Sequence, residues 1–128
     1  MGCEGRVRAE RDRKKKLIAA FHFQFSNRAG WSCGTCRQHR LEEKRRCGFL
    51  PADRRGERRI VWGRKLIQVE ECPKSLVTGE SLALVEEFFV RRRLGISYSP
   101  ELPARKVDAF VILSDEMERE ERDVKAQH

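Results

Sequence analysis

Four cysteines constrain this chain more than any other feature of its sequence. Two residues separate Cys33 from Cys36, ten separate Cys36 from Cys47, and twenty-four separate Cys47 from Cys72. The first pair can turn both sulfurs toward one point, and Gly34 between them lets backbone amides approach the thiolates. Because a structural zinc site is tetrahedral and usually closed by four protein ligands, we predict a zinc site formed by Cys33, Cys36, Cys47 and Cys72.

The fourth ligand is the least constrained part of this prediction, because the last two cysteines do not form a second close pair. His39 and His22 are alternative ligands that could each replace one thiolate. An iron–sulfur cluster also takes four thiolates, although the spacing does not favour it over zinc, and thiols are also common in cores without any metal. Arg37 follows Cys36 where c-type haem attachment requires histidine, which excludes that cofactor.

The composition gives a second reason to expect a metal. Of the 128 residues, 39% are hydrophobic and 38% are charged, so the chain has little apolar material for a large core. Zinc binding supplies folding free energy on the order of 10 kcal/mol in small modules, which is comparable with the whole stability of a typical domain. We therefore expect loss of the metal to unfold the protein.

Other features of the sequence argue against a membrane-spanning or secreted protein. No run of about eighteen apolar residues occurs, so we expect no membrane span, and the basic start lacks the apolar core of a secretory signal. The cysteine spacing is more typical of metal binding than of disulfides, which fits a reducing cytoplasm. Cys3 is the fifth cysteine, and we assign it no role.

The positive charge is concentrated in the half of the chain that holds the cysteine pair. Residues 1–64 contain 18 Lys and Arg against 7 Asp and Glu, whereas residues 65–128 contain 10 against 13. A basic surface beside a zinc site is typical of phosphate contacts with nucleic acid, and a solvated surface is the alternative interpretation. The candidate nucleic-acid-binding residues are Arg37, Arg40, Lys44, Arg45, Arg46, Arg54, Arg55, Arg58 and Arg59.

The pattern along the chain predicts an α+β fold, in which a small zinc-knuckle and β-hairpin module precedes a carboxy-terminal helical hairpin. We predict a basic, disordered tail or frayed helix over residues 1–20 and a zinc-binding, β-rich module over residues 21–76. Within that module, alternating aromatic residues predict a strand over 21–25, followed by a polar helix over 38–46. A hairpin over 59–70 would return Cys72 toward the cysteine pair.

A two-helix segment is expected over residues 77–120, before a frayed end over 121–128. Thr78 is a suitable N-cap for the first helix, which ends at Gly95, and Pro103 marks the start of the second. The two apolar stripes most simply pack on each other and on the small sheet. An exposed patch for a partner, or for a homo-oligomer, is the alternative.

The segment that begins Cys72-Pro73-Lys74-Ser75-Leu76-Val77-Thr78, with the helix end Arg91-Arg92-Arg93-Leu94-Gly95, resembles a family of small cysteine-containing proteins of tailed bacteriophages and prophages. The resemblance covers roughly residues 21–120, and the loop over 96–102 departs from it because it lacks a glycine pair. It implies metal-binding cysteines, a role in virion or tail morphogenesis, and no catalytic residues. The partners it implies are other phage or prophage structural proteins, in the cytoplasm of the bacterial host or on the virion.

The residues offer little support for an enzyme. General acid and base catalysis draws on histidines or carboxylates held in a pocket, and the chain has only His22, His39 and the terminal His128. A catalytic zinc keeps an open position, whereas four thiolates close the site. We therefore predict a non-enzymatic, zinc-stapled structural or assembly protein that acts through protein contacts. The alternative is a zinc-containing nucleic-acid-binding module.

Overall fold

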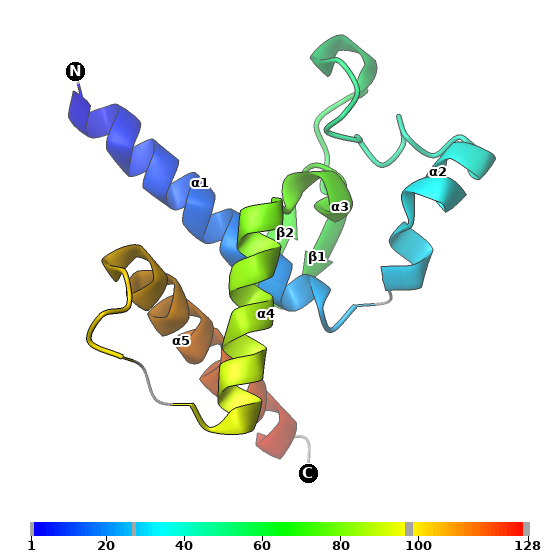
Figure 1. Ribbon diagram of the computed structural model, residues 1–128. Coiled ribbons are helices and arrows are strands. Elements are labelled where there is room, and N and C mark those ends of the chain that lie inside the picture. The colour runs from blue at the N-terminus through cyan, green and yellow to red at the C-terminus, as the bar shows by residue number, and fades with distance from the viewer. Residues whose placement is uncertain (1, 27, 97–98, 127–128) are drawn as a thin grey trace.

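Three long helices, a two-stranded hairpin and several short helical segments make up the computed structural model, which describes residues 2–26, 28–96 and 99–126 (Figure 1). In chain order the elements are α1 (Gly2–Phe23), η1 (Arg28–Trp31), α2 (Cys33–His39), η2 (Ala52–Arg54), β1 (Trp62–Arg64), β2 (Ile67–Val69), α3 (Pro73–Leu76), α4 (Gly79–Leu94) and α5 (Ala104–Ala126). Within the described part of the chain, no helix is both long enough and apolar enough to cross a bilayer.

The carboxy-terminal half of α1 lies between two hydrophobic clusters. On one side, Leu17 and Phe21 pack with residues of α4 and α5, among which Leu113 is completely buried. On the other side, Phe23 packs with Trp62 and other residues of the hairpin, with ring centroids 5.8 Å apart. Helix α1 therefore joins the helical body to the hairpin, and its apolar residues are used on more than one face.

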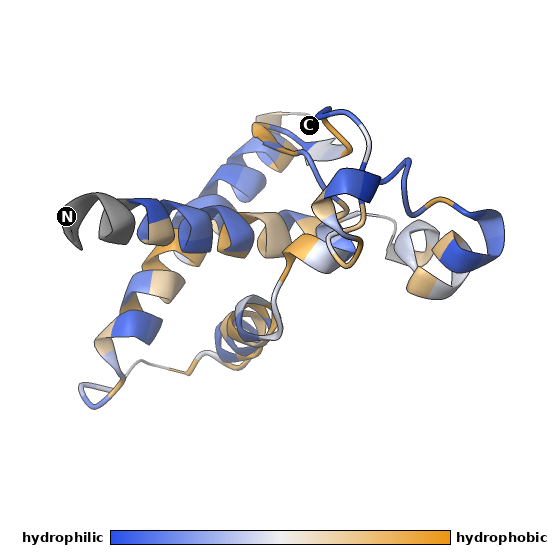
Figure 2. Ribbon diagram, turned by 90° about the horizontal axis from the view of Figure 1, so that it is seen from above, coloured by the Kyte–Doolittle hydropathy of each residue, from blue (hydrophilic) through white to orange (hydrophobic). Residues whose placement is uncertain are grey.

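The amino-terminal half of α1 and the cysteine-containing segment both extend away from this core. Figure 1 shows the first turns of α1 projecting beyond α4 and α5, and Figure 2 shows mostly hydrophilic residues along α1 after the stretch drawn in grey. The segment that carries η1, α2 and η2 lies on the opposite side of the molecule in both views. Of the described residues from Gln24 to Val61, only Cys36 is buried. This segment therefore has almost no hydrophobic core of its own.

The strand predicted over residues 21–25 is wrong, because residues 21–23 form the last turn of α1. Five aromatic and polar residues in alternation fit a strand, but Phe21 and Phe25 are also four positions apart, which suits one side of a helical turn. Their ring centroids are 5.2 Å apart, and no glycine or proline interrupts the chain from residue 6 to residue 29. Helix α1 also continues past residue 20, where we predicted the end of a tail.

The hairpin is confirmed, with Trp62 opposite Val69 and Arg64 opposite Ile67. Gly63 is part of β1, and the turn is formed by Lys65 and Leu66. The short sheet leaves the fold mostly helical, so the α+β prediction holds for the hairpin and the carboxy-terminal helices but overstates the β content.

Helix α4 begins and ends as predicted, and α5 begins where it was predicted to begin. The Thr78 side chain accepts a hydrogen bond from the backbone amide of Ser81, and Gly95 ends α4 in the left-handed conformation with φ of 66°. Helix α5 begins directly after Pro103. Its last described turns reach residue 126, so the predicted frayed end over 121–126 is helical, and residues 127–128 lie outside the described part of the chain.

Replacing the buried ring at the centre of this packing should have a large effect on stability. Phe21 is 0% exposed, so Phe21→Ala is expected to lower the free energy of unfolding by about 3–5 kcal/mol through lost burial and the cavity left behind. Phe49, which is 74% exposed, provides the matched control, and Phe49→Ala should cost less than about 1 kcal/mol. Urea unfolding of both variants measures the difference; equal losses would contradict the assigned core.

Candidate functional site

The four cysteines predicted as metal ligands line one cavity of about 490 Å³. Cys33 and Cys36 lie on α2, Cys47 lies in the loop that follows, and Cys72 lies just before α3. Cys33 is exposed, Cys47 is half-buried, and Cys36 and Cys72 are buried. The aromatic rings of Trp31 and Phe49 also line this cavity, which we call the cysteine cavity.

Local capping interactions place the first two cysteines on a helix. Ser32 is the N-cap of α2, and its hydroxyl accepts a hydrogen bond from the backbone amide of Thr35 at 3.0 Å. Arg40 ends the helix in the left-handed conformation, with φ of 54°. The predicted helix over 38–46 is therefore wrong: helical structure covers the cysteine pair instead, and residues 42–46 form turns.

Hydrogen bonds tie the loop of Cys47 to the turn of Cys72. The backbone amide of Gly48 donates to the Ser75 hydroxyl at 2.8 Å, and this hydroxyl donates to the Cys72 carbonyl at 2.9 Å. A Cβ atom at position 48 would lie 2.8 Å from a Glu71 carboxylate oxygen and 2.9 Å from the Ser75 hydroxyl. Glycine is therefore required for this close approach of two segments that are distant in the sequence.

Arg45 supplies positive charge to the cysteine cavity. One of its guanidinium nitrogens donates to the Gly30 carbonyl at 2.8 Å and lies 3.2 Å from the Cys36 sulfur. The guanidinium carbon also lies 4.3 Å from the centroid of the Trp31 ring. Arg37 and Lys74 add two more cations to the cavity lining, against one acid, Glu42. This surplus would offset the net charge of −2 of a divalent metal bound by four thiolates.

Burial raises the pKa of the Cys72 thiol, and the backbone amides of Lys74 and Ser75 act in the opposite direction by donating toward its sulfur. Cys36 and Cys47 contribute smaller increases through the repulsion between thiolates, which indicates that their sulfurs face the same region. Amide donors of this kind are typical of the surroundings of metal-bound thiolates, because they stabilise the charged form of the sulfur.

The cysteine cavity fits a thiophilic metal in the kind and number of its donors, since four sulfurs suit tetrahedral zinc. The cysteine side chains lie farther apart than such a site requires. Among the described residues, no group of three or more Cys, His, Asp or Glu is placed so that it could hold a metal ion. A four-thiolate site would therefore need the loops around the cavity to close.

The two alternative histidine ligands lie elsewhere. His39 is exposed at the end of α2 and does not line the cysteine cavity. His22 is buried on α1, where its Nε2 atom lies 3.1 Å from a Glu116 carboxylate oxygen of α5. The last turn of α1 thus directs the His22 ring into the interface between α1 and α5.

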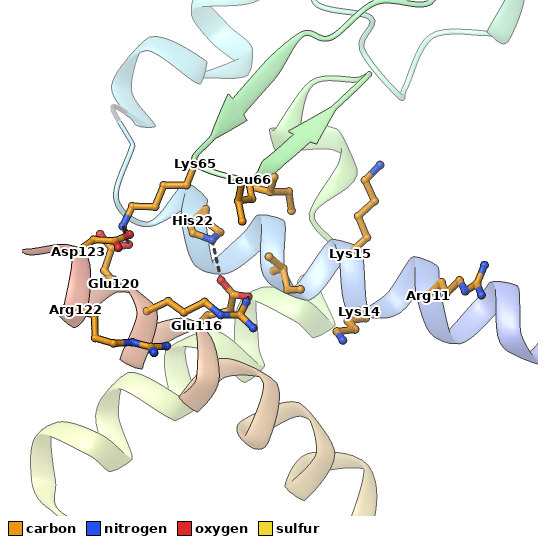
Figure 3. Close-up of a pocket in the computed structure, with 13 residues that line it drawn as sticks. Arg11, Lys14, Lys15, His22, Lys65, Leu66, Glu116, Glu120, Arg122 and Asp123 are labelled. Carbon is orange, nitrogen blue, oxygen red and sulfur yellow. Dashed lines mark hydrogen bonds and ion pairs between the residues drawn. The ribbon is translucent and has the colours of Figure 1, made fainter. Parts of the chain in front are cut away.

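A charged cluster around His22 joins three elements of the fold. Arg64 of β1 donates to His22 Nδ1 at 2.8 Å and to a Glu120 carboxylate oxygen at 2.9 Å. Lys65 also binds Glu120, and Figure 3 shows Lys65 reaching Glu120 and Asp123 while His22 faces Glu116. Because arginine can only donate, Nδ1 must accept, and the ring carries its proton on Nε2 and donates to Glu116. The geometry therefore selects a neutral histidine between a cation and a carboxylate.

Sequence inspection did not find this cluster, although α5 carries a signal. Glu116 follows Leu113 by three positions and Glu120 follows Glu116 by four, so both carboxylates extend the apolar side of the helix toward its end. Acidic residues on a core-facing side need partners. The partners, His22 and Arg64, come from segments too distant in the sequence to be identified by spacing.

Most of the nine predicted nucleic-acid-binding residues are engaged within the protein. Arg55 donates to the carbonyls of Leu50 and Gly48, at 2.9 and 3.0 Å, and other arginines bind acids or carbonyls nearby. The residues with such partners are Arg45, Arg54, Arg55, Arg58 and Arg59. These internal contacts leave fewer cations for phosphate contacts than the sequence suggested.

The chain matches no protein-family model, no curated protein and no solved structure, so its own residues carry the functional argument.

Acid should destabilise the protein in two separate pH ranges. Burial holds the pKa of His22 in the folded protein below 6.5. The contribution of neutral His22 to stability is therefore complete above pH 6.5 and is lost as the pH falls, because the unfolded state binds the proton more readily. Hydrogen bonds from Arg64 are the main cause that lowers the pKa of Glu120 from 4.5 to about 2. Its contribution is therefore complete above pH 4.5 and is lost as the pH falls toward 2.

Urea unfolding between about pH 8 and about pH 3 measures both losses in the wild type. His22→Gln should remove the loss of stability in the higher pH range, whereas His39→Gln, at an exposed histidine, should leave that loss unchanged. Glu120→Gln should remove the loss of stability in the lower pH range. It should also reduce the free energy of unfolding at neutral pH by about 2 kcal/mol, because it leaves buried donors with a weaker partner. Wild-type pH dependence in His22→Gln or Glu120→Gln would contradict the assigned roles.

Proposed function

We propose that the protein is a non-enzymatic, zinc-stapled structural or assembly protein that acts through protein contacts. The observation that carries this proposal is the convergence of Cys33, Cys36, Cys47 and Cys72 on one cavity from three separate parts of the chain. The resemblance of the sequence that begins at Cys72 to small bacteriophage and prophage proteins supports a role in virion or tail morphogenesis.

A cross-link through zinc would stabilise a segment of this chain that packing alone does not hold. The described residues from 24 to 61 bury only Cys36, so packing alone supplies little free energy to hold this segment in place. A structural zinc ion contributes on the order of 10 kcal/mol, and its four ligands would join α2, the following loop and the turn before α3. Arg45 supports this role, because its guanidinium lies 3.2 Å from the Cys36 sulfur and its hydrogen bond to the Gly30 carbonyl fixes the preceding loop.

Exposed apolar side chains on the two carboxy-terminal helices support the expectation of protein contacts. Val90 and Leu94 on α4 are 54% and 67% exposed, and Val111 on α5 is 55% exposed. Single exposed apolar residues are common, but several on two adjacent helices provide surface that a partner can bury. The contact would gain from burial of this surface and would depend little on salt.

Zinc content is the first test of the proposal. We expect about one zinc ion per chain after purification without a metal-binding tag, and loss of both zinc and folded structure in Cys33→Ser and Cys72→Ser. Atomic emission gives the metal-to-protein ratio, and circular dichroism follows the fold.

Cys3→Ser provides the matched control, because Cys3 is the cysteine with no assigned role. It should retain one zinc ion per chain. Two results would contradict the proposal: no metal in the wild-type protein, or full zinc content in both Cys33→Ser and Cys72→Ser.

Nucleic-acid binding is the second candidate function, and α1 provides the observation that favours it. The exposed part of this helix carries several cations for which the described residues provide no ion pair, unlike most of the loop arginines: Arg8, Arg11, Arg13, Lys14 and Lys15. Such a helix can contact phosphates along one or both of its sides.

Salt dependence distinguishes the two candidates. A nucleic-acid complex should weaken by at least tenfold between about 50 mM and about 200 mM salt, because counterions are released from the phosphates. A contact made through the apolar residues of α4 and α5 should change less than threefold over the same range. Binding of a short duplex measured by fluorescence anisotropy gives the first value. Absence of any binding at low salt would exclude nucleic acid as the partner.

A further inference from the structure

A cavity of about 280 Å³, separate from the cysteine cavity, lies between α1 and the segments on either side of the hairpin. Five cationic residues from two parts of the chain line it: Lys15, Lys16, Arg46, Arg55 and Arg58. We call it the basic cavity. The first two residues belong to α1, and the other three belong to the loop that precedes β1.

Three acids also line the basic cavity, but two of them already have cationic partners. Arg58 lies 3.1 Å from Glu70, and Arg55 lies 4.0 Å from Glu71. Asp12 on α1 is the third acid. Lys15, Lys16 and Arg46 remain without such an acidic partner among the described residues, so the cavity retains an excess of positive charge on the side where α1 meets Arg46.

Arg46 provides the strongest sign that a group is bound here. Its Nε and Nη1 atoms are shielded from solvent and make no hydrogen bond with any described residue. Leaving charged donors buried and unsatisfied is strongly unfavourable, and a guanidinium cannot avoid this by losing its proton. Its backbone is held in place, with φ of 50° and its carbonyl accepting from the Cys72 amide at 3.5 Å.

We propose that the basic cavity binds a phosphate group, either as a phosphate monoester or as the phosphodiester of a nucleic-acid backbone. Arg46 would donate hydrogen bonds to its oxygens, and Lys15 and Lys16 would balance its charge. A phosphate fits better than a carboxylate, because it carries up to two negative charges and offers enough acceptors for donors that arrive from two elements. A volume of about 280 Å³ accommodates one phosphate group with a small substituent.

The position of Lys15 links the basic cavity to the exposed part of α1. Its side chain extends from α1 away from Glu116, as Figure 3 shows, so its charge is not used by the cluster around His22. A phosphodiester chain held at Arg46 could therefore continue along the projecting, cationic end of α1. A free phosphate monoester would use the basic cavity alone.

Isothermal titration of the purified full chain tests the proposal with two probes, inorganic phosphate and a ten-nucleotide oligothymidylate. We compare the double variant Lys15→Gln/Lys16→Gln with Arg13→Gln/Lys14→Gln, which removes the same charge from neighbouring positions that do not line the basic cavity. The first variant should weaken binding of inorganic phosphate by at least tenfold, and the second by less than threefold. For the oligonucleotide, whose chain can also contact Arg13 and Lys14 on the exposed part of α1, the loss should again be larger in the first variant. Arg46→Gln should abolish binding, and its circular dichroism spectrum shows whether it remains folded.

Each outcome bears on the proposal. Binding of inorganic phosphate at one site per chain, lost in Lys15→Gln/Lys16→Gln, supports a phosphate monoester. Binding of the oligonucleotide alone with the same selectivity supports a phosphodiester backbone. Equal losses in both double variants indicate general charge attraction and overturn the proposal, as does the absence of binding of either probe. Because zinc content is measured on the same samples, failure here is separate from failure of the metal site.

Discussion

The fold depends on how a long segment with almost no buried apolar side chains is held against a small helical core. Between Gln24 and Val61, Cys36 alone is buried among the described residues, and the segment is fixed by polar contacts such as the Arg45 and Gly48 hydrogen bonds. Polar contacts of this kind contribute about 1 kcal/mol each. A metal bound by four thiolates would contribute far more, which is why the cysteines are central to this account.

Helix α1 connects the remaining parts of the molecule. Its apolar residues pack against α4 and α5 on one side and against the hairpin on another, while His22 joins a charged cluster with Arg64 and Glu116. The cluster adds directional hydrogen bonds to packing that is otherwise apolar. Neutral His22 fits only when Arg64 donates to it and Glu116 accepts from it, which fixes the relative positions of α1, β1 and α5. The beginning of α1 remains available for contacts outside the fold.

Features determined by neighbouring residues were predictable from the sequence, whereas those determined by distant partners were not. The Thr78 cap, the Gly95 end of α4 and the hairpin depend on local chemistry and agree with prediction. The pattern at residues 21–25 fits both a strand and a helical turn, and packing on two sides selects the helix. The role of His22 depends on residues as far as 94 positions away, which no local pattern reveals. Spacing grouped the four cysteines that line one cavity, but it did not predict that the first pair lies on a helix.

X-ray absorption at the zinc edge of the purified protein tests the central claim most directly, because it reports the atoms bound to the metal. The account predicts four sulfur ligands at about 2.3 Å and no nitrogen or oxygen ligand. A shell that contains nitrogen would indicate that a histidine replaces a cysteine, and so contradict the assignment of Cys33, Cys36, Cys47 and Cys72. Zinc coordinated only by oxygen, or no bound zinc, would contradict the proposal of a metal-stapled fold.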